Sequence, residues 1–178
     1  FFHIPLQSGS DTILRAMGRK YTVAEWEQIV TIVKETFSDS TIATDIIVGF
    51  PGETDEDFES TMDLIQRVRP PVVNISKYGD RPGTLASKAE NKVDTSVKKD
   101  RSRRLTKLVN GILEENNKSW IGWTGEVIVK DRGSRGGLMC RNPSYKPIII
   151  IDDIELGVTV PIRIVEAVRT HLFGEIFS

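Results

Sequence analysis

The sequence contains a single cysteine, Cys140, among 178 residues. One thiol cannot form an internal disulfide, a zinc site built on paired cysteines, or an iron–sulfur cluster with three or four thiolate ligands from this chain. Aromatic residues make up only 7% of the chain, and no run of about 18 apolar residues occurs. The N-terminus also lacks a basic stretch that leads into an apolar segment. We therefore expect no membrane span and no signal peptide, and we expect the protein in the cytoplasm.

The chain nonetheless has the composition of a folded protein. Hydrophobic residues make up 39% of it, which is enough for a core, and its length suits one large domain or two small ones. The formal net charge is only −1, yet residues 70–147 carry 16 basic and 8 acidic side chains, whereas residues 1–69 carry 6 and 12. The basic segment favours a polyanion as partner, but a solvated basic helix surface has the same composition.

The first half of the chain alternates between strand and helix patterns. Strand-like apolar runs occupy residues 1–5, 41–50 and 72–78. Helices are predicted at 10–17, 22–37 and 54–69. Thr22 with Glu25 has the pattern of a capping box, and Thr54 with Asp57 caps the last helix. Strand separations of about 25 to 40 residues suit right-handed βαβ crossovers. Residues 1 to about 90 are therefore predicted to form part of a parallel α/β barrel or open sheet.

Two of these helices have an apolar face with the helical spacing of three and four residues. The expected inner faces are Val23, Trp26, Val30, Val33 and Phe37 in the first, and Phe58, Met62, Ile65 and Val68 in the second. The continuous apolar run Ile46–Val48 indicates instead a strand that is buried on both faces. These residues are the predicted core of the first half.

The second half begins with a long helix, predicted at 94–120, whose first turns are rich in Lys and Arg. We expect this helix to connect two domains. The pattern then changes to short strands at 125–130, 138–142, 146–151, 159–167 and 171–177. Five short strands within about 55 residues indicate a small closed antiparallel barrel of the OB type.

Polar, glycine-bearing loops follow each of the three strands in the first half. They are residues 7–10, 49–52 and 78–84. The carboxyl ends of parallel strands meet at one rim of a barrel, and ligands bind there. Glycine lets a ligand approach the backbone, and a following helix N-terminus offers free N–H groups. Each loop alone is more typical of a simple turn than of a binding site, but the three together predict a site for a small polar molecule.

Four segments of the first half form distinctive motifs, namely residues 3–11 (HIPLQSGSD), 17–22 (MGRKYT), 45–54 (DIIVGFPGET) and 81–84 (RPGT). In this order they closely resemble the radical S-adenosylmethionine tRNA methylthiotransferases. Residues from about 122 onward resemble the TRAM domain that ends those enzymes. Within it, 123–129 (WTGEVIV) and 141–147 (RNPSYKP) are most similar to the archaeal and eukaryotic branch. That branch adds a methylthio group to C2 of N6-threonylcarbamoyladenosine at tRNA position 37.

The resemblance implies an α/β fold in which a partial parallel (β/α) radical SAM barrel is followed by a small all-β, OB-like TRAM barrel. Residues 1–93 would be the C-terminal half of the radical SAM barrel, 94–121 a connecting helix, and 122–178 the TRAM domain. The full enzyme uses S-adenosylmethionine and two 4Fe–4S clusters, whose ligands this chain lacks. The chain alone is therefore expected to be inactive. Its expected partners are tRNA, the missing N-terminal portion, and a crystal or dimer contact at the open sheet edge.

The same resemblance assigns cofactor-binding roles to six residues. Gln7 and Ser8 would approach the ribose or methionine part of S-adenosylmethionine, and Asp45, Gly49 and Phe50 would line the adenosine side. Tyr78 would pack at the adenine. Alternatively, Asp45 is a structural carboxylate that is paired inside the barrel. Tyr78, likewise, could serve only to pack against the strands. No catalytic or metal-binding residue is assigned, and Cys140 is expected to be a small core residue.

For RNA, the sequence suggests a cationic surface on the second domain. Lys130, Arg132, Arg135, Arg141 and Lys146 cluster around the turn 133–137, and Tyr145 offers an aromatic face. Cations neutralise phosphates, while an aromatic ring stacks on an unpaired base. A second basic spot near the barrel rim comprises Arg15, Arg19 and Lys20. The alternative for these residues is a surface that serves only solubility.

Two other functions are compatible with the sequence. One is a standalone RNA-binding module without catalysis. The other is a methylthiotransferase that acts on a different adenosine or on an aspartate of a ribosomal protein, for which a less basic second domain is expected.

Overall fold

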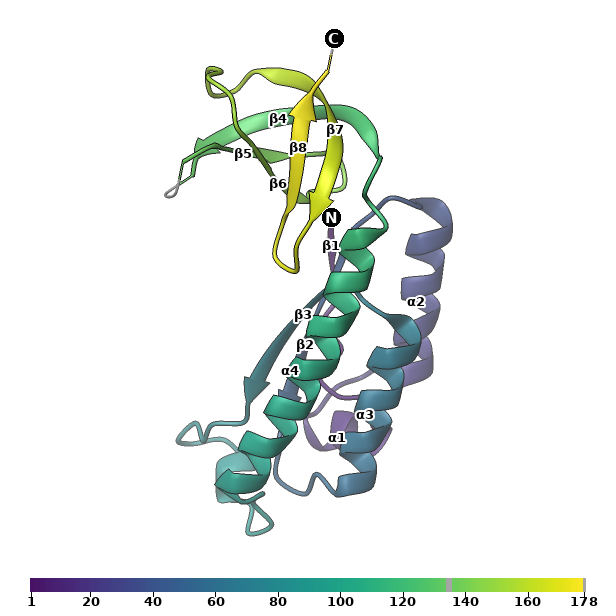
Figure 1. Ribbon diagram of the computed structural model, residues 1–178. Coiled ribbons are helices and arrows are strands. Elements are labelled where there is room, and N and C mark those ends of the chain that lie inside the picture. The colour runs from purple at the N-terminus through teal and green to yellow at the C-terminus, as the bar shows by residue number, and fades with distance from the viewer. Residues whose placement is uncertain (134–135, 178) are drawn as a thin grey trace. The chain divides into compact units, whose positions relative to one another are not determined.

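A computed structural model describes residues 1–133 and 136–177 of the chain (Figure 1). The chain divides into two compact units, which are described separately. One unit comprises residues 2–38 and 42–109, and the other comprises residues 1, 39–41 and 110–178. In the part of the chain that the structure describes, no helix is long and apolar enough to cross a membrane.

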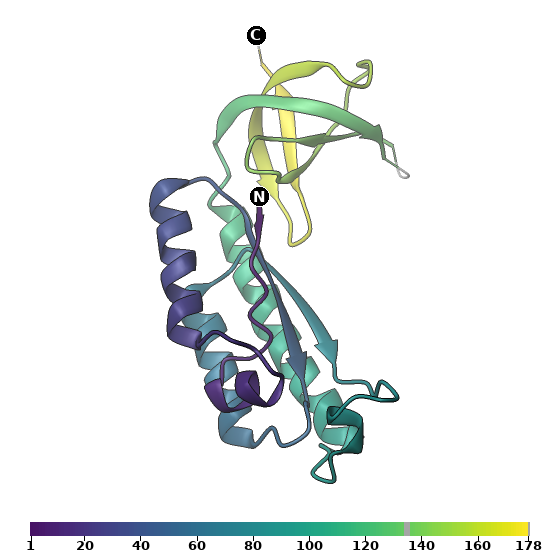
Figure 2. The ribbon, with the colours of Figure 1, turned by 180° about the vertical axis from the view of Figure 1, so that it is seen from behind.

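The first unit is built on a parallel sheet of three strands. These are β1 (Phe2–His3), β2 (Ile42–Val48) and β3 (Val72–Lys77), in the order β1–β2–β3. Three helices connect or follow them, namely α1 (Asp11–Ala16), α2 (Val23–Thr36) and α3 (Asp55–Val68). Figure 2 shows the strands from the side opposite to Figure 1, with α2 and α3 beside them. The predicted parallel pairing is confirmed.

Side-chain caps begin the three helices at the residues that the sequence indicates. The Ser10 side chain accepts a hydrogen bond from a backbone N–H in the first turn of α1. Thr22 with Glu25 and Thr54 with Asp57 form complete capping boxes at α2 and α3. Each box satisfies two backbone N–H groups that have no partner within the helix. The predicted helix starts are therefore confirmed.

The buried faces of α2 and α3 agree only in part with the expected ones. Trp26, Val30, Phe58 and Ile65 are buried as predicted, whereas Val23, Val33, Met62 and Val68 are half-buried. Phe37 is 53% exposed, because α2 ends at Thr36 and the backbone of Phe37 is no longer helical. Leu64, which the predicted pattern missed, is buried next to Ile65.

The two faces of the sheet differ in burial. Ile46 and Val48 of β2 are buried, whereas Asp45 and Ile47, which point to the opposite face, are only half-buried. Burial on both faces is therefore a wrong prediction for Ile47. Its face of the sheet borders a pocket instead of a second packed layer. This asymmetry gives the unit one face for stability and one that is open to a ligand.

The second unit contains a closed five-stranded barrel, as predicted. Its strands are β4 (Thr124–Arg132), β5 (Leu138–Arg141), β6 (Pro147–Ile150), β7 (Thr159–Ala167) and β8 (Leu172–Ile176), in the order β4–β5–β6–β8–β7. The expectation that all pairs are antiparallel is wrong for β6 and β8, which are parallel. β7 pairs with β4, and β8 forms an antiparallel hairpin with β7. β8 therefore closes the barrel between β7 and β6, and it runs in the same direction as β6.

The barrel core is a single apolar cluster. It comprises Val127, Val129, Leu138, Cys140, Ile148, Ile150, Ile162, Ile164 and Leu172. The prediction that Cys140 is a small core residue is confirmed, since its side chain is fully buried. Alternate residues of each strand point into the core, as expected for a small barrel whose interior is filled by side chains.

The predicted long helix is α4 (Thr95–Lys118), and a short 3₁₀ helix, η1 (Ala86–Lys88), precedes it. The division into compact units falls within α4, between residues 109 and 110. Residues of α4 are buried in both units, among them Leu105 in the first and Ile112 in the second. The domain limits expected from the sequence, at 93 and 121, stay predictions.

Two glycine substitutions, one in each unit, test the packing around the helices with opposite expected signs. A Cβ atom at Gly9 would lie 2.5 Å from the Cα atom of Thr61 in α3, whereas one at Gly111 of α4 would meet nothing within 4 Å. We expect Gly9→Ala to lower the free energy of unfolding by about 1–3 kcal/mol. Gly111→Ala should raise it by about 0.5–1 kcal/mol, because alanine favours helix. Urea titrations followed by circular dichroism measure both, and a Gly9→Ala variant of unchanged stability would contradict this packing.

Candidate functional site

A pocket of about 510 Å³ lies at the carboxyl ends of the parallel strands. Its lining comes from the loop after β1, the end of β2, the loop after β3 and the turn after α1. Four of the six predicted cofactor-binding residues line it, namely Gln7, Asp45, Phe50 and Tyr78. Ser8 and Gly49 do not belong to the lining. The three loops predicted to form a site therefore meet at one rim. Each contributes to the lining, the first through Gln7, the second through Phe50 and the third through Arg81.

Gln7 is held at the pocket in an unusual backbone conformation. Its φ is +77°, in the left-handed region that residues other than glycine seldom adopt. Its N–H donates to the carbonyl oxygen of Asp45 at 2.8 Å, and its own carbonyl accepts from the N–H of Ile47 at 2.9 Å. Both bonds fix this strained backbone against β2. Such strain is concentrated at functional sites, and here it places a polar side chain at the pocket.

Asp45 occupies the centre of a polar ladder across the open face of the sheet. Its Oδ2 atom lies 2.9 Å from Nε2 of His3 in β1, and its Oδ1 atom accepts from Nδ2 of Asn74 in β3 at 2.8 Å. Both carboxylate oxygens thus have a partner. This geometry fits the alternative role of Asp45 as a paired structural carboxylate. Asp45 also lines the pocket.

Phe50 and Tyr78 form the aromatic side of the pocket. Their ring centroids lie 5.2 Å apart with an interplanar angle of 74°, which is an edge-to-face contact. The Tyr78 N–H donates to the carbonyl oxygen of Val48, so the ring is held where β3 leaves β2. Aromatic and aliphatic groups from two loops are therefore available to a flat ligand.

Ser8 and Gly49 brace the pocket loops from behind. Ser8 is buried, and its Oγ atom accepts from the N–H of Ser10 at 3.2 Å. The Gly49 N–H donates to Oε2 of Glu53 at 2.7 Å. A Cβ atom at Gly49 would overlap the side chain of Lys98, with Cγ only 2.1 Å away, and φ is +73°. Gly49 is therefore required for the packing of its turn, and its N–H group is already bonded.

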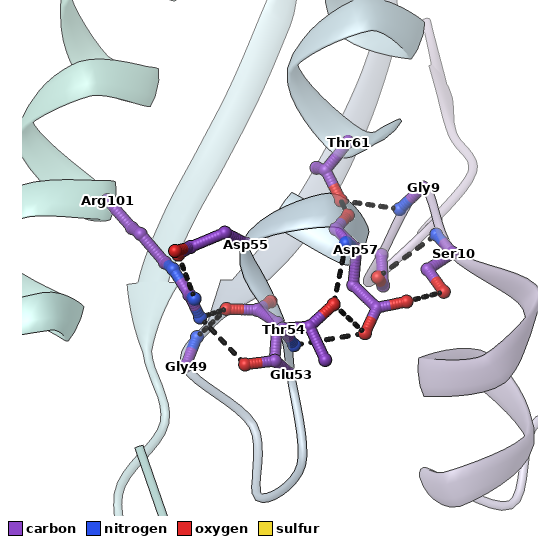
Figure 3. Close-up of polar contacts among 10 residues, drawn as sticks. Gly9, Ser10, Gly49, Glu53, Thr54, Asp55, Asp57, Thr61 and Arg101 are labelled. Atoms are coloured by element: carbon purple, nitrogen blue, oxygen red, sulfur yellow. Dashed lines mark hydrogen bonds and ion pairs between the residues drawn. The ribbon is translucent and has the colours of Figure 1, made fainter. Parts of the chain in front are cut away.

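A buried ion pair, which the sequence analysis missed, fixes the turn between β2 and α3 (Figure 3). Arg101 of α4 donates from Nη1 to Oε2 of Glu53 at 2.6 Å and to the Glu53 carbonyl oxygen at 3.1 Å. Its Nη2 atom bonds Oδ1 of Asp55 at 2.7 Å. The side chains of Arg101 and Glu53 are only 5% and 2% exposed. Burial raises the pKa of Glu53, although the hydrogen bonds from Gly49 and Arg101 oppose this shift.

Part of the basic character of α4 is therefore used inside the fold. Besides Arg101, Arg104 pairs with Glu59 of α3, and Arg103 pairs with Asp100 on its own helix. The signal in the sequence was the opposite charge of residues 53–59 and 98–104. For these arginines, the structure supports pairing within the protein as the reason for the local charge.

A second polar contact joins the loop after β1 to α3. The Ser10 Oγ atom donates to Oδ1 of Asp57 at 2.5 Å, and the Gly9 N–H donates to Oγ1 of Thr61 at 2.9 Å (Figure 3). Burial favours a higher pKa for Asp57, but hydrogen bonds from Ser10 and Thr54 outweigh it and hold this pKa below its usual value. The stabilisation from Asp57 is thus present at neutral pH and is lost as the pH falls through the folded-state pKa.

On the barrel, three of the predicted RNA-binding residues come together. The guanidinium carbon of Arg141 lies 4.6 Å from the centroid of the Tyr145 ring, and Nζ of Lys130 lies 6.0 Å from it. Arg141 also donates from Nη1 to the Tyr145 carbonyl oxygen at 2.8 Å. Tyr145 is 46% exposed and has a φ of +65°. These three residues, called the Tyr145 cluster below, combine two cations with an accessible ring.

The other predicted RNA-binding residues are distributed differently. Lys146 is buried, and its Nζ atom donates to Oδ1 of Asn117 at 3.1 Å. Burial also lowers its pKa, so Lys146 is part of the protein interior, contrary to the surface position expected from the sequence. Arg132 is exposed at the end of β4. Arg135 lies outside the described residues.

The second predicted basic spot is divided between two environments. Arg15, Arg19 and Lys20 are all exposed. Arg19 lines the pocket, whereas Arg15 and Lys20 are not among its lining residues. Arg15 instead donates from Nη2 to Oγ1 of Thr12, one turn earlier in α1, at 3.4 Å.

The residues that the structure describes do not fit a metal cluster. Over residues 1–133 and 136–177, no three His, Cys, Asp or Glu side chains are grouped so that they could hold a metal ion. Cys140 is enclosed in the barrel core, and burial raises the pKa of its thiol to about 11. A buried protonated thiol is a poor metal ligand.

Comparisons with known proteins are consistent with the pocket and with the motifs around it. Residues 1–65 match the sequence model of the Radical SAM superfamily. The probable threonylcarbamoyladenosine tRNA methylthiotransferase of Pyrococcus abyssi is 42% identical over 100% of this chain. The tRNA-2-methylthio-N(6)-dimethylallyladenosine synthase of Pelotomaculum thermopropionicum is 42% identical over 97% of it. The chain is a homologue of the radical SAM tRNA methylthiotransferases.

The chain spans only part of these relatives. It covers 41% of the Pyrococcus abyssi protein and 39% of the Pelotomaculum thermopropionicum protein. Among solved structures, coproporphyrinogen III oxidase (HemN) from Escherichia coli, described as a radical SAM enzyme, matches with a TM-score of 0.52. That match has 12% sequence identity and covers 99% of this chain and 45% of the other. It supports the fold, in agreement with the family match.

Removal of Arg101 tests the role of the buried ion pair. We expect Arg101→Met to lower the free energy of unfolding by about 3–5 kcal/mol at pH 7, because Glu53 is left buried without its partner. In that variant the pKa of Glu53 in the folded state rises further above the unfolded value. The deficit should therefore shrink as the pH falls toward the unfolded pKa. Urea titrations at pH 7 and pH 5 measure this change.

The double variant Arg101→Met/Glu53→Gln is the matched control. It lacks the buried charge altogether, so it should be more stable at pH 7 than Arg101→Met alone. The account would be contradicted if the loss of unfolding free energy in Arg101→Met were the same at both pH values and the double variant were no more stable than the single one. The ion pair would then not be the source of the lost stability.

Proposed function

We propose that this chain is the C-terminal part of a tRNA methylthiotransferase, which adds a methylthio group to C2 of N6-threonylcarbamoyladenosine at tRNA position 37. The observation that carries the proposal is the pocket at the carboxyl ends of the parallel strands. Half of its lining residues, from Gln7 to Phe50, lie within residues 1–65, which match the Radical SAM superfamily. The whole chain is similar to enzymes that are named as tRNA methylthiotransferases. The reaction would take place in the cytoplasm, where tRNA is modified.

The pocket suits S-adenosylmethionine as the cofactor. Its volume of about 510 Å³ is within the usual range for small-molecule sites, and it combines aromatic with polar lining groups. Phe50 and Tyr78 would contact the adenine, and Gln7 would approach the ribose or methionine part. Asp45 would border the adenosine through the oxygens that His3 and Asn74 orient. When bound, the cofactor would supply the radical and the methyl group.

Ser8 and Gly49 would contribute to this site indirectly. Both were expected to touch the cofactor, but the contacts of Ser8 with Ser10 and of Gly49 with Glu53 favour a role in shaping the loops. Because Gly49 is followed directly by Phe50, the position of one residue constrains the other. The turn would thus orient the aromatic wall for the cofactor.

The iron–sulfur clusters of the proposed enzyme would be held by a segment outside this chain. The radical SAM methylthiotransferases use two 4Fe–4S clusters, and the only thiol here is enclosed in the barrel core. The N-terminal portion of the longer protein would therefore complete the active site. We accordingly expect no cleavage of S-adenosylmethionine by the 178-residue chain alone.

The barrel would act as a TRAM domain that binds tRNA. The Tyr145 cluster supports this role, because its two cations suit phosphates and its ring suits an unpaired base. Arg132, at the end of β4, would add a phosphate contact, and the prediction that Arg135 adds another is kept from the sequence. Arg15, Arg19 and Lys20 would meet the anticodon loop at the rim of the pocket. Lys146 would support the cluster from within the barrel.

The N6 substituent of the modified adenosine is inferred from fewer residues than the methylthiolation reaction itself. Relatives named for threonylcarbamoyladenosine and for dimethylallyladenosine are equally identical to this chain, at 42%. The segments 123–129 and 141–147 favour the former. An aspartate of a ribosomal protein is a weaker alternative, because the Tyr145 cluster suits RNA. A standalone RNA-binding module would leave the pocket of the first unit without a function.

The direct test uses the longer protein in which this chain occurs, with reconstituted clusters and a tRNA that carries N6-threonylcarbamoyladenosine. Mass spectrometry of the nucleosides should detect the methylthio derivative and, in the same reaction, 5′-deoxyadenosine. Omission of S-adenosylmethionine is the control. Formation of 5′-deoxyadenosine without any thiolated nucleoside from this tRNA or from one with dimethylallyladenosine would contradict the proposed function.

Titrations of this chain with tRNA at several salt concentrations test the role of the barrel. Each phosphate contact to single-stranded RNA lowers the slope of log K against log[salt] by about 0.7, so Lys130, Arg132 and Arg141 together predict about −2. Lys130→Gln should flatten the slope by about 0.7. Tyr145→Ala should weaken binding by about 1–3 kcal/mol with little change in slope.

Arg163→Gln serves as the matched control for that titration, because Arg163 is exposed on β7 but does not belong to the Tyr145 cluster. It should leave both affinity and slope nearly unchanged. If all three substitutions changed binding equally, or if binding did not depend on salt, the Tyr145 cluster would not be the RNA contact.

A further inference from the structure

A groove of about 570 Å³ lies on the barrel of the second unit. It is lined by residues of β6, β8 and β7, which are neighbours in the barrel, and by the two residues that follow β6 (Figure 1). We call it the barrel groove. None of the three residues of the Tyr145 cluster lines it. The proposed RNA contact therefore leaves the barrel groove without a role.

The barrel groove exposes large apolar side chains to water. Ile151 is 86% exposed, Val165 40% and Ile176 38%. Ile149 and Phe173, which are opposite each other in the pairing of β6 with β8, are half-buried in the same lining. Apolar side chains that gather in one exposed groove are typical of a binding surface, because their removal from water is favourable.

An irregularity in β7 places two successive side chains at this groove. The pairing of β7 with β8 shifts register between Ile164 and Glu166, which is the pattern of a β-bulge at Val165. In a regular strand Val165 and Glu166 would point to opposite faces of the sheet. Here both are exposed and line the barrel groove, while Ile164 is buried in the core. A bulge that redirects a side chain in this way is often found beside a functional surface.

The charged residues of the barrel groove are all acidic. They are Asp152, Glu166 and Glu175, and each is exposed. Over residues 1–133 and 136–177, the side chains of Glu166 and Glu175 have no hydrogen bond or ion pair, although Arg163 lies opposite Glu175 in the strand pairing. Residues 148–178 as a whole carry 5 acidic and 2 basic side chains. The groove is therefore negative, in contrast to the cationic Tyr145 cluster on the same barrel.

One end of β8 also offers main-chain groups beside the groove. β8 pairs with β7 through residues 172–176, but with β6 only through residues 172–174. In the part of the chain that the structure describes, residues 175 and 176 thus have a strand neighbour on one side only. An extended peptide can pair with such an edge, and its side chains then alternate between the two faces of the sheet.

We propose that the barrel groove is a docking surface for an extended, cationic segment of another protein. Apolar side chains of that segment lie against Val165 and Phe173, while its Lys or Arg side chains pair with Glu166 and Glu175. The carboxylates repel the phosphates of a nucleic acid, so the occupant is a protein. Opposite charges also speed the encounter and fix the register of the bound segment. This inference does not rest on the proposed function, which uses other residues of the chain.

The experiment is a set of fluorescence anisotropy titrations of the 178-residue chain with labelled peptides of about ten residues. One peptide alternates Lys with Val, the second Lys with Ser, and the third Glu with Val. Only the first combines positive charge with apolar side chains. We expect it to bind roughly tenfold more tightly than either of the others, since each of them lacks one of the two contributions.

Substitutions locate the binding. The double variant Glu166→Gln/Glu175→Gln should weaken binding of the Lys–Val peptide by about two- to tenfold and reduce its salt dependence. Val165→Ser should weaken it by about three- to tenfold through lost apolar contact. Glu126→Gln is the matched control, because Glu126 is exposed on β4 but does not line the groove, and it should change nothing. Circular dichroism spectra verify that the variants are folded.

The remaining outcomes identify other occupants or overturn the site. Equal binding of the three peptides, no binding of the Lys–Val peptide, or a double variant that behaves like Glu126→Gln would overturn the proposal. A dimer in sedimentation experiments that Val165→Ser dissociates would assign the groove to a second copy instead. Peptide binding by this chain but not by the longer protein would show that the rest of the polypeptide covers the groove. Binding by both proteins that the groove substitutions weaken supports a separate protein partner.

Discussion

The pocket depends above all on the buried ion pair between Arg101 and Glu53. Two charges that are almost fully removed from water are stable only when their geometry is good and additional hydrogen bonds satisfy them. Glu53 meets this condition through Arg101 and the N–H of Gly49, and Arg101 through Glu53 and Asp55. The pair thereby joins α4 to the turn that ends β2. Phe50, the aromatic wall of the pocket, is part of that turn.

The open face of the sheet gives the pocket its chemical character. β1, β2 and β3 are parallel, so their carboxyl ends and the loops that follow them meet at one rim. On that face the His3, Asp45 and Asn74 side chains bond across all three strands, and both oxygens of the pocket-lining Asp45 carboxylate have a partner. Over residues 1–133 and 136–177, by contrast, the side chains of the pocket-lining Arg19 and Arg81 have no hydrogen bond or ion pair. A pocket that combines aromatic, polar and cationic lining residues is consequently suited to a small polar ligand.

Local signals in the sequence predicted most of the fold, whereas long-range partners could not be read from it. Capping residues such as Thr54 act within one helical turn, and the alternation in Val127–Val129 reflects a nearby core, so both were recognised. The parallel pairing of β6 and β8 depends on which strands close the barrel, a choice that no local pattern encodes. Lys146 and Arg101 resembled surface cations, because their partners Asn117 and Glu53 are 29 and 48 residues away in sequence.

The most direct test of this account is the location of the nucleoside site in the chain itself. Two-dimensional NMR spectra of the isotope-labelled chain should be recorded during a titration with S-adenosylhomocysteine, which needs no iron–sulfur cluster to bind. The account predicts that backbone signals of Gln7, Ile47, Phe50 and Tyr78 shift together with one dissociation constant, while those of the barrel core around Cys140 stay in place. Shifts confined to the barrel, or none at the pocket under saturating ligand, would contradict it.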